Sequence, residues 1–177
     1  MRPVKYLLIT GLVFFLLSFA QHEKYPVPEK DNKLLFYIQR NHNSNTIIYD
    51  ANYDANGYLL KSKPIEVYWR RYDEEGQRME LRAVEKWYAY GVDWEETDEE
   101  HTFKIELVAN KEKDFRLKQD KPFHAYVLTD INGKASVLDH MYIYADNSGM
   151  WPTVIYIELF GQDTQSGAKT YEKIIVE

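Results

Sequence analysis

Apolar and polar residues alternate along most of the chain, which is the pattern of β-strands that bury one face. In the stretch PIEVYWRRY, for example, Ile65, Val67 and Trp69 point to the same side of the predicted strand. The predicted strands are residues 34–40, 46–53, 64–72, 102–110, 114–118, 123–129, 136–145, 154–160 and 170–176. The chain is therefore expected to be mainly β.

Short turns containing glycine separate many of these strands. Asn56-Gly57 and Asn132-Gly133 are hairpin signals, because both central residues of a type I′ turn have positive φ. From residue 123 onward the connections are short enough for an antiparallel meander. The expected fold is an antiparallel β-sandwich or a closed barrel of about eight or nine strands, and the two have the same periodicity.

One segment, QRMELRAVEKWYAYG, has a helical period instead. Its apolar residues recur at three- and four-residue spacing, at Leu81, Val84, Trp87 and Tyr88. The spacing predicts one amphipathic helix over about residues 79–90, with Gly91 after its end. Its apolar stripe is expected to be buried against the sheet. The acidic stretch that follows, VDWEETDEEH, is expected to be a solvated loop.

The first twenty residues, MRPVKYLLITGLVFFLLSFA, combine a basic start, an apolar run and small residues at Ser18 and Ala20. This pattern predicts a secretory signal peptide that is cleaved after Ala20, with an uncleaved anchor as the alternative. Residues 21–33 contain two prolines and several charges, and they predict a flexible lead-in. Residues 34–177 then form a single β-rich domain, in a periplasmic or secreted protein.

The composition excludes several classes of function. The chain has no cysteine, so it forms no disulfide, thiolate metal site or cysteine nucleophile. The formal net charge is −6, and it becomes −8 when Arg2 and Lys5 leave with the signal peptide. An acidic chain without a basic stripe argues against nucleic acid and anionic membranes as partners. No further apolar run is long enough to span a membrane, and no cofactor is expected.

The sequence contains no G-x-S-x-G elbow, no P-loop and no H-E-x-x-H helix. Its five histidines are scattered and form no local zinc pattern. Asp139 and His140 are neighbours on a predicted strand, so they are expected on opposite faces, which is the wrong arrangement for an acid–imidazole pair. No catalytic residue is assigned, and a pair of carboxylates assembled by folding is the open alternative.

Tyrosine is the unusual feature of the composition, with 15 residues in the chain. On several predicted strands, tyrosines occupy the face opposite the apolar one. The candidate ligand-binding residues on such faces are Tyr68, Arg70, Tyr126, His140, Tyr142, Tyr144, Tyr156 and Glu158. Amphipathic rings with nearby charges suit a glycan or an apolar small molecule. Alternatively, the tyrosines only stabilise cross-strand pairs, and the exposure of the rings distinguishes the two interpretations.

The segments LLFYIQRNHNSNTIIYDAN, PIEVYWRRYDEEGQR, ELRAVEKW and AYGV resemble a family of small exported proteins from Bacteroidetes-type genomes, classed as a domain of unknown function. The resemblance covers the chain from Leu34 to its end. It implies a periplasmic or secreted location, and it supplies no activity, ligand or catalytic residue.

The sequence favours an exported, non-catalytic β-rich module that binds a glycan, an apolar small molecule or an envelope partner through its tyrosine-bearing face. One alternative is a carboxylate-dependent hydrolase acting on glycan or lipid. Two convergent carboxylates in a cleft, one of them with a raised pKa, would favour that alternative. The other alternative is a structural envelope protein with no ligand.

The stretch DANYDANGY resembles a calcium loop, with Asn52, Asp54 and Asn56 as weak candidate ligands. In that register Lys63 occupies the position where a helix-loop-helix calcium site requires a bidentate glutamate. A hairpin turn at Asn56-Gly57 explains the same residues, so we expect no metal site here.

Millimolar Ca²⁺ is therefore expected to leave the melting temperature of the protein unchanged, because no ligand set stabilises the folded state by binding it. Thermal unfolding with and without Ca²⁺ checks this. A rise in melting temperature that a chelator reverses would contradict it.

Overall fold

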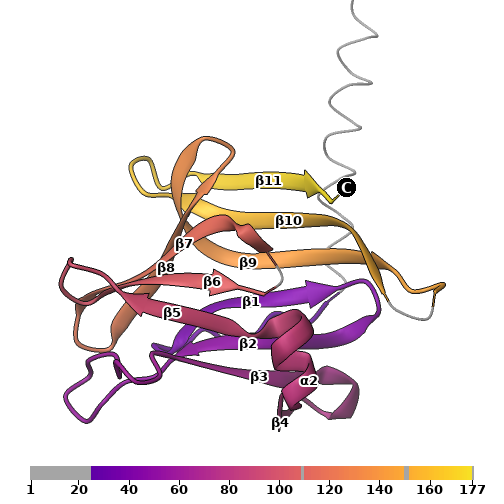
Figure 1. The fold of residues 1–177 in the computed structure, drawn as a ribbon, viewed down its shortest axis with the longest axis horizontal. Coiled ribbons are helices and arrows are strands. Elements are labelled where there is room, and N and C mark those ends of the chain that lie inside the picture. Colours follow the sequence, from indigo (N-terminus) through magenta and orange to yellow (C-terminus); the bar gives the residue numbers. More distant parts are fainter. Residues whose placement is uncertain (1–24, 109, 150–151, 177) are drawn as a thin grey trace, which may run out of the picture.

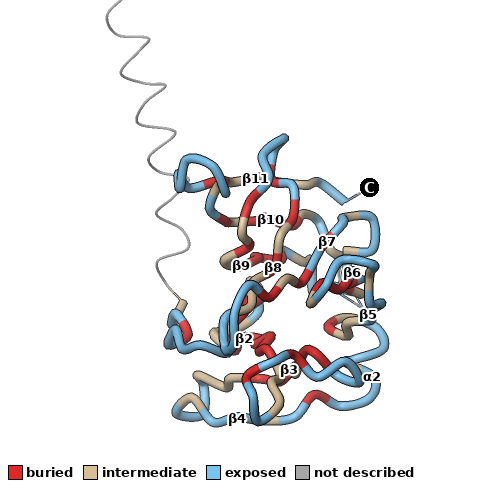
Figure 2. Tube along the Cα trace, turned by 90° about the vertical axis from the view of Figure 1, so that its left-hand side faces the viewer, coloured by how far each residue is buried: buried red, intermediate tan, exposed pale blue. Residues whose placement is uncertain are grey.

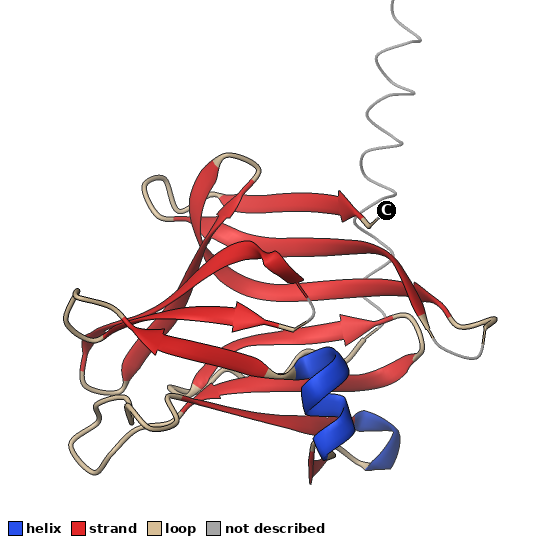
Figure 3. Ribbon diagram, in the orientation of Figure 1, coloured by secondary structure: helices blue, strands red, loops and turns tan. Residues whose placement is uncertain are grey.

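The computed structural model describes residues 25–108, 110–149 and 152–176. The predicted signal peptide lies outside the described residues. Strands make up most of the described chain, and helical residues are confined to two short segments (Figure 3). Within the described residues, no helix is long and apolar enough to cross a membrane.

The strands are β1 (Leu34–Arg40), β2 (Asn43–Ala51), β3 (Ile65–Arg71), β4 (Gln77–Glu80), β5 (Val92–Glu96), β6 (Thr102–Leu107), β7 (Asn110–Lys121), β8 (His124–Ile131), β9 (Lys134–Asp146), β10 (Thr153–Asp163) and β11 (Lys169–Ile175). The helical elements are η1 (Tyr72–Glu74), α2 (Ala83–Glu85) and the π-helical turn η2 (Lys86–Tyr90). Every predicted strand is present, with its ends shifted by a few residues. The pattern missed β4, and it also missed β5, which lies in the stretch expected to be a solvated loop.

The strands form one sheet in the order β4-β3-β2-β1-β9-β8-β7-β6-β5, and β10 and β11 continue from the other edge of β9. The mainly β class is confirmed, and the sheet curls into a half-barrel where the sequence predicts a sandwich or a closed barrel (Figure 1). The meander predicted from residue 123 onward is confirmed by the antiparallel pairing of β8, β9, β10 and β11. The pairing of β1 with β9 is parallel, which strand periodicity does not reveal.

Strand β9 divides the sheet. One of its edges pairs with β8 through residues 134–137 and then with β1 through residues 140–143. Its other edge pairs with β10 along most of its length. Because β8 and β1 follow one another along the same edge, the sheet separates there into two wings. One wing consists of β1–β4 and the other of β5–β8, and they face each other across the core.

A β-bulge lies at the point of division. Phe160 of β10 is opposite His140, whereas the next residue, Gly161, is opposite Leu138, so Asp139 is an extra residue on β9. The core-facing positions of β9 are even-numbered before the bulge and odd-numbered after it. The bulge therefore reverses the inward and outward directions along this strand.

The main hydrophobic core fills the space between the two wings, where buried residues from the strands face each other (Figure 2). Its largest fully buried side chains include Phe36 and Tyr49 from one wing and Phe115 and Leu117 from the other. The rings of Phe36 and Tyr49 stack with their centroids 4.3 Å apart. This core accounts for the apolar face of the predicted strands.

The helix predicted over residues 79–90 is wrong in its length and its packing. The first of these residues belong to β4, and helical structure begins at Ala83. Leu81 is buried, but Trp87 and Tyr88 are 73% and 67% exposed. The segment is a short α-turn followed by a π-turn, so the spacing that aligns an apolar stripe in an α-helix does not apply.

The two Asn-Gly turns differ. Asn132 and Gly133 both have positive φ, at 54° and 77°, as the type I′ prediction requires. At the other turn only Gly57 has positive φ, so the type I′ prediction is wrong there. The Asp54 carboxylate closes this turn instead, since it accepts hydrogen bonds from the backbone N–H groups of Asn56 and Tyr58.

Gly161→Ala is expected to destabilise the protein by about 2–4 kcal/mol, because the added methyl group would overpack a buried site and strain its surroundings. A Cβ at this position would lie 2.5 Å from the Val137 carbonyl oxygen, next to the bulge. Gly133→Ala is the control, because a Cβ added at that position would have no atom within 4 Å, and only the positive φ is strained. Chemical denaturation measures both, and an equal or smaller loss at Gly161 would contradict the bulge.

Candidate functional site

Seven of the eight candidate residues lie on the side of β3, β2, β1, β9, β10 and β11 that is turned away from the main core, called here the outer face. They are Tyr68, Arg70, His140, Tyr142, Tyr144, Tyr156 and Glu158. Directly paired residues form a continuous row across this face: Tyr171, Phe160, His140, Tyr37, Ile48 and Tyr68. Register across the sheet thus brings together tyrosines that are far apart in the sequence.

Tyr126 is the exception among the candidates. It lies on β8, in the other wing, and its ring contacts that of His124. Alternation along a single strand gives the face of a residue, but not which wing that strand belongs to.

The outer face is open only in part. Tyr68 and Tyr142 are 4% and 7% exposed, whereas Tyr144 is 39% exposed. Tyr156 is half-buried, and its ring stacks on Tyr144 with the centroids 4.9 Å apart. The four tyrosines therefore do not form one open platform, which the simplest binding interpretation of the sequence requires.

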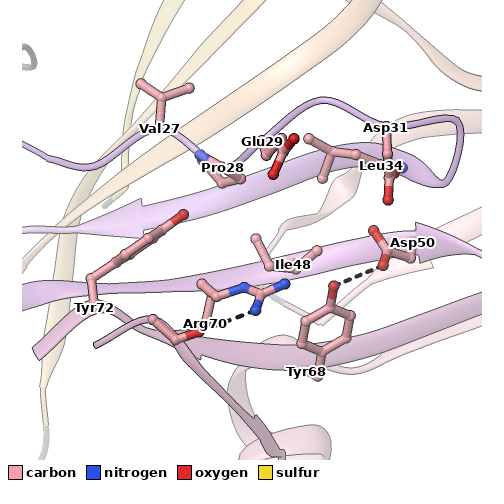
Figure 4. A pocket seen from close by; sticks show the side chains of 11 residues that line it. Val27, Pro28, Glu29, Asp31, Leu34, Ile48, Asp50, Tyr68, Arg70 and Tyr72 are labelled. Atoms are coloured by element: carbon pink, nitrogen blue, oxygen red, sulfur yellow. Dashed lines mark hydrogen bonds between the residues drawn. The ribbon is translucent and has the colours of Figure 1, made fainter. Parts of the chain in front are cut away.

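A cleft of about 520 Å³ opens on the outer face beside the first strands (Figure 4). The chain that precedes β1 forms one wall, through Val27, Pro28, Glu29 and Asp31. Leu34 and Ile48 supply aliphatic surface, and Asp50, Tyr68, Arg70 and Tyr72 supply the polar groups on the β2 and β3 side. This is the size of an ordinary small-molecule site, about 300–1,000 Å³.

Asp50 and Tyr68 form the most deeply buried polar contact of the cleft. The Tyr68 hydroxyl donates a hydrogen bond of 2.8 Å to Asp50 Oδ2, and Asp50 is 8% exposed. Burial raises the pKa of Asp50, partly offset by this hydrogen bond. Burial, together with the same hydrogen bond to the carboxylate, raises the pKa of Tyr68 to about 12. Asp50 is thus a carboxyl group whose neutral form is favoured more than usual.

Two arginine side chains, Arg70 and Arg78, lie over the ring of Tyr68. The Arg78 guanidinium lies 3.8 Å from the Tyr68 ring centroid and pairs with Glu66 at 3.1 Å. Burial opposes the ionisation of Glu66, but the hydrogen bond and charge of Arg78 prevail and lower its pKa. Arg70 donates to the Gly76 carbonyl oxygen at 3.1 Å, which fixes its guanidinium at the cleft. The ring of Tyr68 is therefore held by cation–π contact as well as by Asp50.

Two further carboxylates line the same cleft, at Glu29 and Asp31. The charge of Asp31 contributes to the raised pKa of Asp50. One oxygen of Asp31 accepts hydrogen bonds from the backbone N–H groups of Lys33 and Leu34, so its position is fixed by the turn into β1. The cleft therefore places a carboxyl group with a raised pKa, that of Asp50, beside two further carboxylates.

Asp139 and His140 form an acid–imidazole pair, so the expectation that they lie on opposite faces is wrong. His140 Nδ1 is 2.8 Å from Asp139 Oδ2, because the bulge turns both side chains outward. The His140 ring stacks between Tyr37 and Phe160, with centroids 4.9 Å and 4.3 Å away. The hydrogen bond from His140, together with Lys30, lowers the pKa of Asp139 to about 2. Asp139 is accordingly ionised at any ordinary pH.

The weak calcium candidates do not converge on a cation position. Asp54 Oδ1 is engaged in closing the turn, and the Asn52 side-chain amide donates to the Lys63 carbonyl oxygen at 3.0 Å. Within the described residues, no cluster of three or more histidine or acidic side chains could hold a metal ion.

Sequence reasoning missed Asp50 and Tyr72 as parts of the cleft, as well as the chain before β1. Asp50 is the first residue of the stretch DANYDANGY, which was interpreted only as a hairpin turn. Tyr72 lies just after the strand that carries Tyr68. Two prolines in the segment before β1 suggested a lead-in, although Pro28 is buried. A carboxylate that directly follows the apolar run IIY on a predicted strand is the signal that could have identified Asp50.

A family model described as "Domain of unknown function (DUF4833)" matches residues 36–173. No curated protein and no solved structure matches the chain.

Tyr68→Phe is expected to destabilise the protein by about 1–3 kcal/mol at pH 7, since it removes a donor from a buried carboxylate. The loss should shrink towards pH 4. Without the Tyr68 hydroxyl the pKa of Asp50, which burial already raises, rises further, and the protonated carboxyl group needs no donor. Denaturation at both pH values measures this. Tyr126→Phe is the control, and an equal loss there, or a loss independent of pH, would contradict the role of the pair.

Proposed function

The chain belongs to the DUF4833 family, a domain of unknown function, and we propose its function from the cleft: it is an exported, non-catalytic module that binds a glycan. One observation carries the proposal, the convergence of fixed donors and acceptors over aliphatic surface in a cleft of about 520 Å³. The family description supplies no activity of its own.

The chemistry of the lining matches that of a sugar. Each sugar hydroxyl donates and accepts hydrogen bonds, and the cleft offers acceptors on Asp50 and donors on Arg70. The C–H faces of a sugar ring pack on apolar or aromatic surface, which Ile48 and Tyr72 provide. Because Asp50 and Arg70 are already held by protein partners, little side-chain freedom is lost on binding.

The same lining disfavours an apolar small molecule, the other ligand class that the sequence allowed. Such a ligand would cover Glu29, Asp31, Asp50 and Arg70 without hydrogen-bonding to them. Removing charged groups from water without a partner costs several kcal/mol, about 1–3 kcal/mol even for each neutral one. A hydroxyl-rich ligand avoids this cost because it replaces the water.

A glycan hydrolase is the second candidate, and the carboxyl groups of the cleft favour it. Burial raises the pKa of Asp50, and Asp31 lines the same cleft. In this alternative the protonated Asp50 donates its proton to the leaving glycosidic oxygen, and an ionised partner acts on the sugar or on water. The third possibility, a structural envelope protein, requires that the cleft bind nothing.

An oligosaccharide array probed with the mature chain tests the proposal, followed by calorimetry on the strongest hit. Asp50→Asn and Tyr72→Ala should each weaken binding about tenfold or more, because each removes roughly 1.4 kcal/mol or more of contact energy. Tyr126→Ala, outside the cleft, is the control and should bind as the wild type does.

Absence of any glycan binding, or equal binding by the cleft variants, would contradict the proposal. If new reducing ends appear in the bound oligosaccharide and Asp50→Asn abolishes them, the hydrolase is the correct alternative.

A further inference from the structure

The middle of the outer face is buried by something other than the main core. Tyr37, Ile48 and Tyr68 form a separate small cluster, with Leu34 packed against it. Tyr37 is only 3% exposed, although its side of β1 faces away from the core. Part of the protein must therefore cover it from outside.

Residues 25–31 provide this cover. The Gln39 side chain donates a hydrogen bond of 3.0 Å to the Pro26 carbonyl oxygen, and Lys30 pairs with Asp139 at 2.5 Å. Gln39 is two residues from Tyr37 on the same side of β1, and Asp139 adjoins the residue paired with Tyr37. The chain between the two contacts therefore passes over Tyr37, and Pro28 within it is buried. The same chain forms a wall of the cleft (Figure 4).

The hydrogen bonds that fasten the backbone of the segment are concentrated at one end. From Asp31 onward the turn into β1 is fixed, since Ala51 N–H donates to the Lys33 carbonyl oxygen and Tyr53 donates to that of Asn32. Within the described residues, the backbone of 26–30 makes one hydrogen bond, to the Gln39 side chain. A segment with so few backbone hydrogen bonds opens more readily than the strands beneath it.

Before Asp31, side-chain contacts hold the segment: the Gln39–Pro26 hydrogen bond, the Tyr25 ring against that of Tyr142 with centroids 6.1 Å apart, and a charged contact from Lys30 to a prepared acceptor. Asp139 Oδ1 accepts from Lys30, while Oδ2 accepts from His140, whose ring is clamped between Tyr37 and Phe160. The bulge and the stacked rings fix the carboxylate, so only Lys30 must be positioned. The Lys30 and Asp139 side chains are 68% and 38% exposed, and ion pairs with this exposure are easily released by competing water and salt.

We propose that residues 25–31 are a displaceable lid, latched by Lys30 onto the Asp139–His140 pair, and that its opening joins the cleft to the covered residues Tyr37 and Gln39. The inference rests on the proposed function, because it makes the glycan site adjustable in length. The cleft then extends from β3 across β2 and β1 to β9, about 14 Å at roughly 4.8 Å per strand. Closed, the site accommodates a short sugar. Open, it accommodates an oligosaccharide chain.

Hydroxyl-radical footprinting of the mature chain, read by mass spectrometry, tests the lid without any ligand. Lys30→Ala and Lys30→Glu should raise the labelling of Tyr37 at least threefold, because they release the cover. High salt should raise it in the wild type. Tyr49, fully buried in the core, and Tyr88, 67% exposed, are internal controls that should not change.

Lys61→Ala is the matched control variant, since Lys61 forms an ion pair with Glu96 at 72% and 47% exposure, away from the lid. It should leave Tyr37 protected. Unchanged Tyr37 labelling in both Lys30 variants would overturn the lid. Because the readout contains no glycan, a failed array with increased labelling would refute the proposed function and leave the lid supported.

Discussion

The bulge at Asp139 in β9 is the constraint on which the architecture depends. One strand edge cannot pair with β8 and β1 at the same place, so the two must follow one another along it. The extra residue changes the twist of β9 at the point of transfer, and it reverses the faces of the strand. The two wings of the sheet can then turn towards each other around a single core, and the far end of β9 presents its tyrosines outward.

The same bulge assembles the outer face. It points Asp139 and His140 in one direction and aligns His140 with Tyr37 and Phe160, so that rings from three strands stack side by side. Stacked rings across strands are worth about 0.5–1.5 kcal/mol each beyond their burial. The outer face is thus rigid where residues 25–31 pack on it, and the same residues form one wall of the cleft. Binding chemistry and sheet geometry have a common origin in this arrangement.

Much of the sheet could be predicted from alternation, because half-buried strands such as β3 and β6 show it directly. The sharing of β9 could not, since pairing partners depend on contacts far apart in the sequence and a parallel pair leaves no periodic trace. Gly161 within β10 was the available signal for a bulge, because a glycine in a strand often permits close backbone approach. The strand β5 was missed because its acidic residues resemble a loop, although its edge position explains them as protection against pairing with other chains.

Strand periodicity predicted which side chains lie on the outer face, but not how exposed they are. Strand parity correctly grouped His140 with Tyr142 and Tyr144, yet it contains no information about a distant segment that folds back over them. Asp50 became visible as a functional group only when its burial and its bond to Tyr68 were known.

An NMR study of the His140 ring can establish whether the bulge at Asp139 orders the outer face. Nuclear Overhauser contacts from this ring to both Tyr37 and Phe160 are expected, with a slowly exchanging, downfield Nδ1 proton bonded to Asp139. Contacts from His140 to core methyl groups such as those of Leu159, without contacts to Tyr37, would contradict the bulge and the face that depends on it.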